Sequence, residues 1–139
     1  MSAPEEPRID PALQPRPGDV SYDLDRALSA VIALRSHIPE DALTAQMLGT
    51  ERAGHGVVID ARGLVLTVGY LVTEAETIWL VDIHGRATPG HALGYDQETG
   101  FGLVQALGQL NLPALEIGSS ADLKVGENVV LAGYGGARN

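Results

Sequence analysis

The histidines and one tyrosine are the main candidates for catalytic or ligand-binding side chains in this sequence. His55 lies in a Gly-His-Gly triplet, and Tyr70 follows "LTVG", where the chain should bend sharply after a strand. A histidine can act as a general base or bind a metal. His84 and His91 lie on either side of a Pro-Gly pair, but their spacing is not diagnostic of metal ligands. We therefore predict no metal site, and we expect these histidines to face solvent.

A β pattern positions these side chains from Gly49 onward. Short β-branched runs alternate with turn signals such as "ARG" at 61–63 and "HGR" at 84–86. Six or seven short strands, with turns about every 8 to 12 residues, are typical of a β-sandwich or a small barrel. The 17 glycines suit tight turns and barrel corners. We predict an all-β fold whose last strand is "ENVVLAGYGG", residues 127–136.

The segments before this β region have a different composition. Residues 1–21 are acidic and rich in proline, which lacks the N–H donor that a helix or sheet interior needs, so we expect a disordered arm. Residues 22–48 are expected to form a short helical turn from Asp23, a strand that stops before Pro39, and a loop that leads into the barrel.

The overall composition excludes several classes of function. The formal net charge of −9, without clusters of Lys or Arg, argues against nucleic-acid binding. The absence of cysteine excludes disulfides and thiolate sites. No apolar run approaches the roughly 18 residues that span a bilayer. The N-terminus lacks the apolar region of a signal peptide, so we expect a cytoplasmic protein, or a periplasmic one if the N-terminus has been trimmed.

Several blocks in the right order resemble one known family. The strand start "GHGVVID" at 54–60, the strand "LVLT", the "HGR" hairpin and "IGSSADLKVGENVVLAGYG" at 117–135 resemble the first β-barrel of trypsin/chymotrypsin-like serine proteases, specifically the HtrA/Deg branch. The resemblance covers about two-thirds of the chain. It implies an antiparallel Greek-key barrel of six to seven strands over residues 49–136, followed at 137–139 by the start of an inter-barrel linker.

The resemblance also implies what should occupy the catalytic positions. The family's "LTNNHVV" stretch, which carries the general base, corresponds to "LTVGYLV" at 66–72 and places Tyr70 at the histidine position. The stretch that carries the family's acid corresponds to "DQETGFGLV" at 96–104 and places Gly100 at the acid position. The nucleophilic serine of the family lies on a second barrel. A tyrosine hydroxyl is a poor proton acceptor at neutral pH, and glycine has no side chain to orient a base.

We therefore expect no catalytic residue and no cofactor. His55 and Tyr70 are the candidates to line the remaining cleft, and His55 has no evident carboxylate to orient it as a substitute base. The resulting hypothesis is a proteolytically inactive, HtrA-like pseudoprotease domain that binds a protein or peptide, or serves as a scaffold. The alternative is the N-terminal half of a processed serine peptidase whose nucleophile lies on a separate C-terminal segment. The expected partner is that second-barrel segment or a copy of the chain itself.

Overall fold

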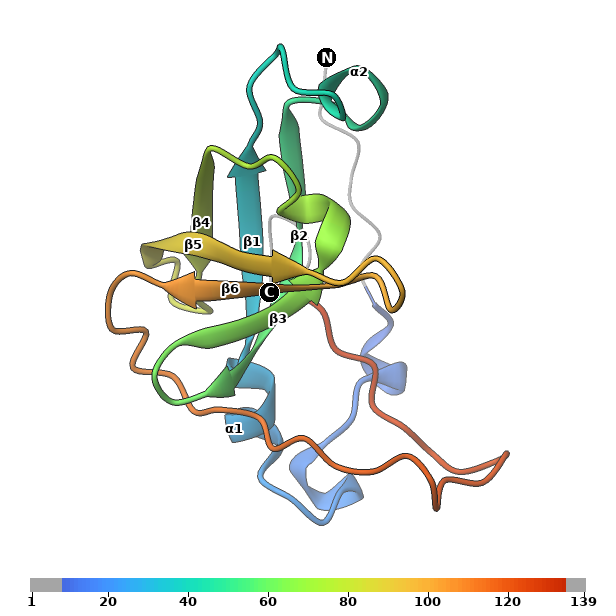
Figure 1. Cartoon of the computed structure of the whole chain (residues 1–139). Helices are drawn as coiled ribbons and strands as arrows, with labels where there is room; N and C mark the ends of the chain where they lie inside the picture. The colour runs from blue at the N-terminus through green and yellow to red at the C-terminus, as the bar shows by residue number, and fades with distance from the viewer. Residues whose placement is uncertain (1–8, 135–139) are drawn as a thin grey trace, which may run out of the picture.

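The structure, a computed structural model, describes residues 9–134 and contains a closed barrel of six antiparallel strands (Figure 1). Around the barrel the strands run in the order β1-β2-β3-β6-β5-β4, and β4 pairs with β1. The partial order β4-β1-β2-β3 is that of a Greek key. The predicted all-β, antiparallel barrel is confirmed. The strands are β1 Val31–His37, β2 Glu51–Asp60, β3 Leu64–Val68, β4 Thr77–Val81, β5 Ala87–Tyr95 and β6 Phe101–Ala106.

Helical structure within residues 9–134 is confined to short segments. The predicted helical turn is confirmed as α1, and the carboxylate of Asp23 caps it by accepting a hydrogen bond from the Arg26 amide at 3.0 Å. A second short helix, α2, replaces part of the predicted loop. No helix among these residues is long and apolar enough to cross a membrane. The segments are η1 Pro11–Leu13, η2 Pro17–Asp19, α1 Leu24–Ser29, α2 Ala45–Leu48 and η3 Gly69–Leu71.

The barrel interior is filled by every second residue of its strands. Ile32 and Leu34 of β1, Val65 of β3 and Val104 of β6 are completely buried. Because successive side chains of a strand point to opposite faces, the residues between them lie on the outer surface. Full burial of such a side chain stabilises the fold by about 1.5–3 kcal/mol. The other buried members of this core are Ala30, Val58, Leu71, Val72, Ile78, Leu80, Ala106 and Leu110.

The predicted last strand is wrong in the part that the structure describes. Residues 127–134 belong to no strand, and Val129 and Leu131 are 75% and 97% exposed. The physical reason is the topology: six strands already close the barrel, so no free edge beside β1 or β6 is left for a seventh. The apolar, β-branched composition of this stretch is typical of a strand, but the barrel is complete without it.

The segment boundaries also differ from those expected. The barrel begins with β1, which pairs with both β2 and β4, and not at residue 49. In the arm expected to be disordered, residues 9–21 contain the turns η1 and η2, each with a proline at its start, where the missing N–H is tolerated. The rest of that arm (1–8) and the predicted linker (137–139) lie outside the described residues.

Candidate functional site

Tyr70 lies in η3, the turn that follows β3. The next two residues, Leu71 and Val72, are buried in one end of the barrel and draw the turn inward. Tyr70 points the other way and is 46% exposed. Gly69 has to be a glycine, because a side-chain carbon there would overlap the ring of Tyr95. The turn is therefore held by packing on both sides of Tyr70, and part of the phenol ring faces solvent.

Gly100 ends the turn that connects β5 to β6. Its φ of +80° lies in the left-handed region, which side chains rarely adopt, and its amide donates to the carbonyl oxygen of Asp96 at 2.8 Å. The Asp96 carboxylate accepts hydrogen bonds from the Thr99 hydroxyl at 2.6 Å and the Glu98 amide at 3.1 Å. The bond from Thr99 is the main reason that the pKa of Asp96 lies below its ordinary value. This carboxylate is thus used to close the turn.

The structure brings the two positions predicted from the resemblance close together. The amide of Gly69, the residue before Tyr70, donates a hydrogen bond to the carbonyl oxygen of Gly100 at 2.7 Å. The η3 turn and the β5–β6 turn therefore form one continuous surface at the same end of the barrel. On that surface the η3 turn carries the phenol of Tyr70, whereas the β5–β6 turn has no side chain at Gly100.

A buried arginine behind η3 fixes this surface. Arg52 is only 4% exposed, and its guanidinium donates to the carbonyl oxygens of Tyr70 at 2.6 Å and Thr73 at 3.1 Å. It also donates to the Thr44 hydroxyl at 2.8 Å, and that hydroxyl donates to the Glu74 carboxylate at 2.6 Å. The bond from Thr44 is the largest cause of the lowered pKa of Glu74. Arg52 thus holds the backbone of Tyr70 from the inside of the site.

Sequence reasoning missed Arg52, although a signal was present. In β2 the even-numbered residues face the interior, as the burial of Gly56 and Val58 shows, and Arg52 has the same parity. An arginine at an inward position of a strand must find several acceptors, since leaving such a charge unpaired is costly. The carbonyl oxygens of a neighbouring turn are the acceptors that it finds here.

His55 is on the outer surface of β2 and is exposed, as expected. Its carbonyl oxygen accepts a hydrogen bond from the Thr67 hydroxyl at 2.6 Å, and Gly133 lies against its imidazole ring. Among residues 9–134 its ring makes no hydrogen bond to Tyr70 or to any carboxylate. The structure therefore gives no contact that joins His55 and Tyr70 into one cleft.

The other histidines are not gathered into a ligand set. His84 and His91 are both exposed, on the β4–β5 turn and on β5. His37 contacts Glu51 across the β1–β2 pair, with 2.5 Å between Nδ1 and Oε1. In the part of the chain that the structure describes, no group of three or more His, Asp or Glu side chains is placed to hold a metal ion.

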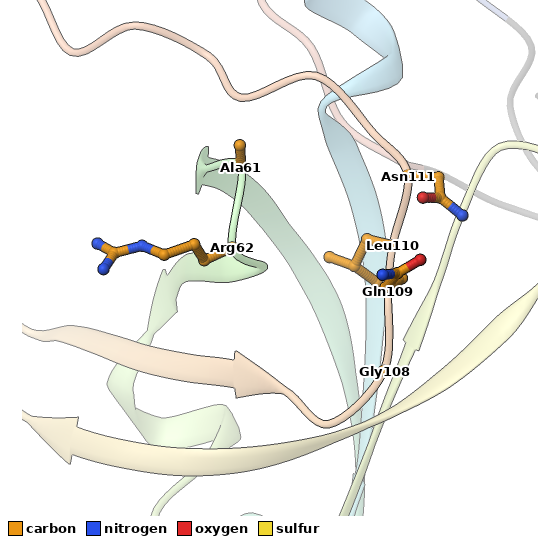
Figure 2. A pocket seen from close by; sticks show the side chains of 6 residues that line it. All are labelled: Ala61, Arg62, Gly108, Gln109, Leu110 and Asn111. Atoms are coloured by element: carbon orange, nitrogen blue, oxygen red, sulfur yellow. The ribbon is translucent and has the colours of Figure 1, made fainter.

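An open pocket of about 290 Å³ lies at the opposite end of β3 from Tyr70. It is formed by the β2–β3 turn and the segment that follows β6. Figure 2 shows the Arg62 side chain pointing away from Gln109 and Asn111. The Arg62 guanidinium donates a hydrogen bond to the carboxylate of Asp60 at 2.9 Å. This bond is the main reason that the pKa of Asp60 is lowered to about 2. With its one cation already paired, the pocket offers no free charge to a ligand.

Comparison with known proteins gives the same family for sequence and structure. The sequence profile of trypsin-like peptidase domains matches residues 54–139. Serine protease PepD of Mycobacterium tuberculosis is 26% identical over 144 residues, which cover 96% of this chain and 28% of PepD. The periplasmic serine endoprotease DegP of Salmonella typhimurium is 33% identical over 81 residues, which cover 58% of this chain and 17% of DegP.

A solved structure agrees with these relatives. The HtrA-type protease AlgWS227A with tripeptide superposes with a TM-score of 0.61 and 27% identity. The match covers 73% of this chain and 30% of that protein. The chain therefore spans less than a third of the length of these relatives, and the shared part is the N-terminal barrel.

Proposed function

This chain belongs to the trypsin-like peptidase domain family, and on that premise we propose that it is a proteolytically inactive, HtrA-like domain that binds a protein or peptide or serves as a scaffold. The observation that carries the proposal is the pair Tyr70 and Gly100. The resemblance assigns them to the general base and the orienting acid, and the hydrogen bond from Gly69 to Gly100 joins their two turns. The retained barrel and the lost side chains together favour binding over catalysis.

Chemistry supports this reading of the pair. A serine hydroxyl is a weak nucleophile without an adjacent base, and the phenol of Tyr70 is a poor substitute for imidazole. Loss of triad members typically leaves only about 10³- to 10⁴-fold catalysis over water. Neither His55 nor Asp96 replaces the missing groups, because the ring of His55 has no carboxylate partner among the described residues and Asp96 closes its own turn.

The test is reaction with a fluorophosphonate probe, together with hydrolysis of unfolded casein. We expect no covalent labelling and no cleavage above a buffer blank, with a DegP-type protease as the positive control. Stoichiometric labelling that survives denaturation would show that the chain holds an activated serine and that the proposed function is wrong.

A second candidate is favoured by residues 127–134. In this candidate the chain is the N-terminal half of a processed serine peptidase, and a separate C-terminal segment carries the nucleophile. The stretch around Val129 and Leu131 has the composition of a strand but belongs to no strand among residues 9–134. Such a strand suits pairing with a second β-domain. Reconstitution with a C-terminal barrel should then give probe labelling, whereas the first candidate predicts none.

The partners and the location belong to the same proposal. We propose a second-barrel segment or a second copy of the chain as the partner, and no nucleic acid. We propose a cytoplasmic location, whereas the relative DegP of Salmonella typhimurium is periplasmic by name. Fractionation of cells that express the intact protein distinguishes the two compartments.

A further inference from the structure

A chain of hydrogen bonds joins two segments that lie far apart in the sequence. The α2 segment, residues 42–49, is part of the connection between β1 and β2 at the top of the barrel in Figure 1. The η3 segment, residues 69–74, follows β3 and carries the candidate site. Arg52 donates to the hydroxyl of Thr44, which donates to the carboxylate of Glu74. We call these three residues the polar latch.

The α2 segment is held mainly by contacts from other parts of the chain. The helix has only four residues, and a helix of this length is not stable by itself. Ala45 is its one buried residue, whereas Leu43 and Met47 are 90% and 89% exposed. The amides of Leu43 and Thr44 donate to the Glu74 carboxylate at 3.2 and 2.8 Å. Glu74 therefore anchors the start of α2 from the η3 segment.

Glu74 has a backbone conformation that is uncommon for a residue with a side chain. Its φ of +59° lies in the left-handed region, and such a conformation persists only where the surrounding structure holds it. The carboxylate of Glu74 accepts three hydrogen bonds: the two from the amides and one from the Thr44 hydroxyl at 2.6 Å. The contacts that anchor α2 therefore also fix the end of the η3 segment.

Arg52 binds both segments from the interior of the protein. Its guanidinium donates to the carbonyl oxygen of Gly49 at 3.2 Å and to the Thr44 hydroxyl at 2.8 Å, at the two ends of α2. It also donates to the carbonyl oxygens of Tyr70 and Thr73 in the η3 segment. Because unpaired donors on a buried cation are costly, displacement of either segment weakens the hold of Arg52 on the other.

We infer that the α2 and η3 segments open and close as one unit, and that the polar latch couples them through the hydroxyl of Thr44. That hydroxyl contacts both other members of the latch, since it accepts from Arg52 and donates to Glu74. The inference rests on the proposed function in one respect, because it takes Tyr70 as part of the binding surface. A ligand that contacts α2 then alters the Tyr70 turn, and a ligand at Tyr70 alters α2, since coupling between two sites is reciprocal.

Native-state hydrogen exchange on the 139-residue chain tests this coupling without any substitution. The α2 reporters are the amides of Leu48 and Gly49, which donate to carbonyl oxygens within the α2 segment. The η3 reporters are the amides of Val72 and Thr73, which donate to the carbonyl oxygen of Gly69. We expect both pairs to show one opening free energy and one dependence on urea, as in a single cooperative unit. Different urea dependences for the two pairs would overturn the inference.

Substitutions separate the latch from a general loss of stability. Glu74→Gln keeps the shape of the side chain but removes its charge, so exchange of both reporter pairs should accelerate at least about tenfold. Amides of β3 and β6 should keep their wild-type rates. Glu76→Gln is the matched control, because Glu76 is also exposed and its side chain makes no hydrogen bond among residues 9–134. Its exchange rates should stay within about twofold of wild type.

Thr44→Val removes the bridging hydroxyl and keeps the shape of the side chain. In this background Glu74→Gln should still accelerate the α2 pair, but it should no longer change the η3 pair, because the path between them is broken. If Glu74→Gln in the wild-type background accelerates the α2 pair alone, the segments are independent and the inference is wrong. Unchanged rates in both pairs also overturn it. Fluorophosphonate labelling reports on the proposed function separately, because segments that open independently in an unlabelled chain contradict only the coupling.

Discussion

The amide of Gly69 donates a hydrogen bond to the carbonyl oxygen of Gly100 over 2.7 Å. This bond joins the turn that carries Tyr70 to the turn that precedes β6. It depends on two glycines for different reasons: Gly69 leaves room for the ring of Tyr95, and Gly100 adopts a φ of +80°. The two turns are therefore held together by backbone groups, without any contribution from the catalytic side chains that we propose are lost.

Replacing Gly100 with alanine should cost about 1–2 kcal/mol of unfolding free energy, measured by urea denaturation. The cost arises from the left-handed backbone, because the space around a side-chain carbon at Gly100 is open. Gly94→Ala is the matched control, since Gly94 has equally open space without a positive φ, and it should change stability by less than about 0.5 kcal/mol. Equal effects of the two substitutions would contradict this account.

Tyr70→His should not create proteolytic activity. An imidazole at this position would have no carboxylate to orient it, because Gly100 faces it with backbone alone. We expect casein hydrolysis by the variant to equal that of wild type and of the control Tyr95→His, which changes a similarly exposed tyrosine nearby. Hydrolysis by Tyr70→His alone would show that the general-base position has been assigned to the wrong residue.

Much of the barrel could be predicted from the sequence because its signals are local. The alternation in "LVLTV" and the turn residues at 61–63 give β3 and its hairpin directly. The closure of the barrel is not a local property. β1 closes it by pairing with both β2 and β4, and the composition of β1 does not indicate these two partners. For the same reason the composition of residues 127–134 predicts a strand, although the closed barrel has no free edge with which it could pair.

The site was predictable only in part. The resemblance predicts that Tyr70 and Gly100 occupy the catalytic positions, and in the structure a hydrogen bond joins their two turns. The guanidinium network of Arg52 joins residues from the α2 segment, β2 and η3, which are far apart in the sequence. Parity along β2 indicates that Arg52 points inward, but its acceptors are set by the packing of the η3 turn.

The stability of the chain should fall in acid through Asp82, which is only 3% exposed. Burial raises the pKa of this carboxyl, but hydrogen bonds from the Arg86 and His84 amides and the Arg86 guanidinium outweigh it, and the net pKa is lowered. A carboxyl with a lowered folded-state pKa stabilises the fold above its unfolded-state pKa, and this contribution is lost as the pH falls below about 4.

Urea unfolding between about pH 6 and about pH 3 measures the contribution of Asp82 to the free energy of unfolding. The slope of unfolding free energy against pH should be shallower for Asp82→Asn than for wild type. Asp122→Asn, a change at an exposed aspartate with no side-chain hydrogen bond among residues 9–134, should leave the slope unaltered. Parallel slopes for wild type and Asp82→Asn would exclude Asp82 as a source of the acid sensitivity.

Arg52→Met should destabilise the barrel and loosen the Tyr70 turn. The substitution keeps a long apolar side chain but removes every donor to the carbonyl oxygens of Tyr70 and Thr73, which lie 2.6 and 3.1 Å from the guanidinium. Loss of a buried, charge-assisted network of this kind costs about 2–4 kcal/mol. Hydrogen exchange of the Val72 and Thr73 amides, which donate to the carbonyl oxygen of Gly69, should accelerate more than that of the core strands.

Arg35→Met is the control, because Arg35 is an exposed arginine on β1, and its removal should change stability by less than about 0.5 kcal/mol. If both variants unfold at the same urea concentration, the Tyr70 turn is held by packing of Leu71 and Val72 alone, and Arg52 has no role in positioning it.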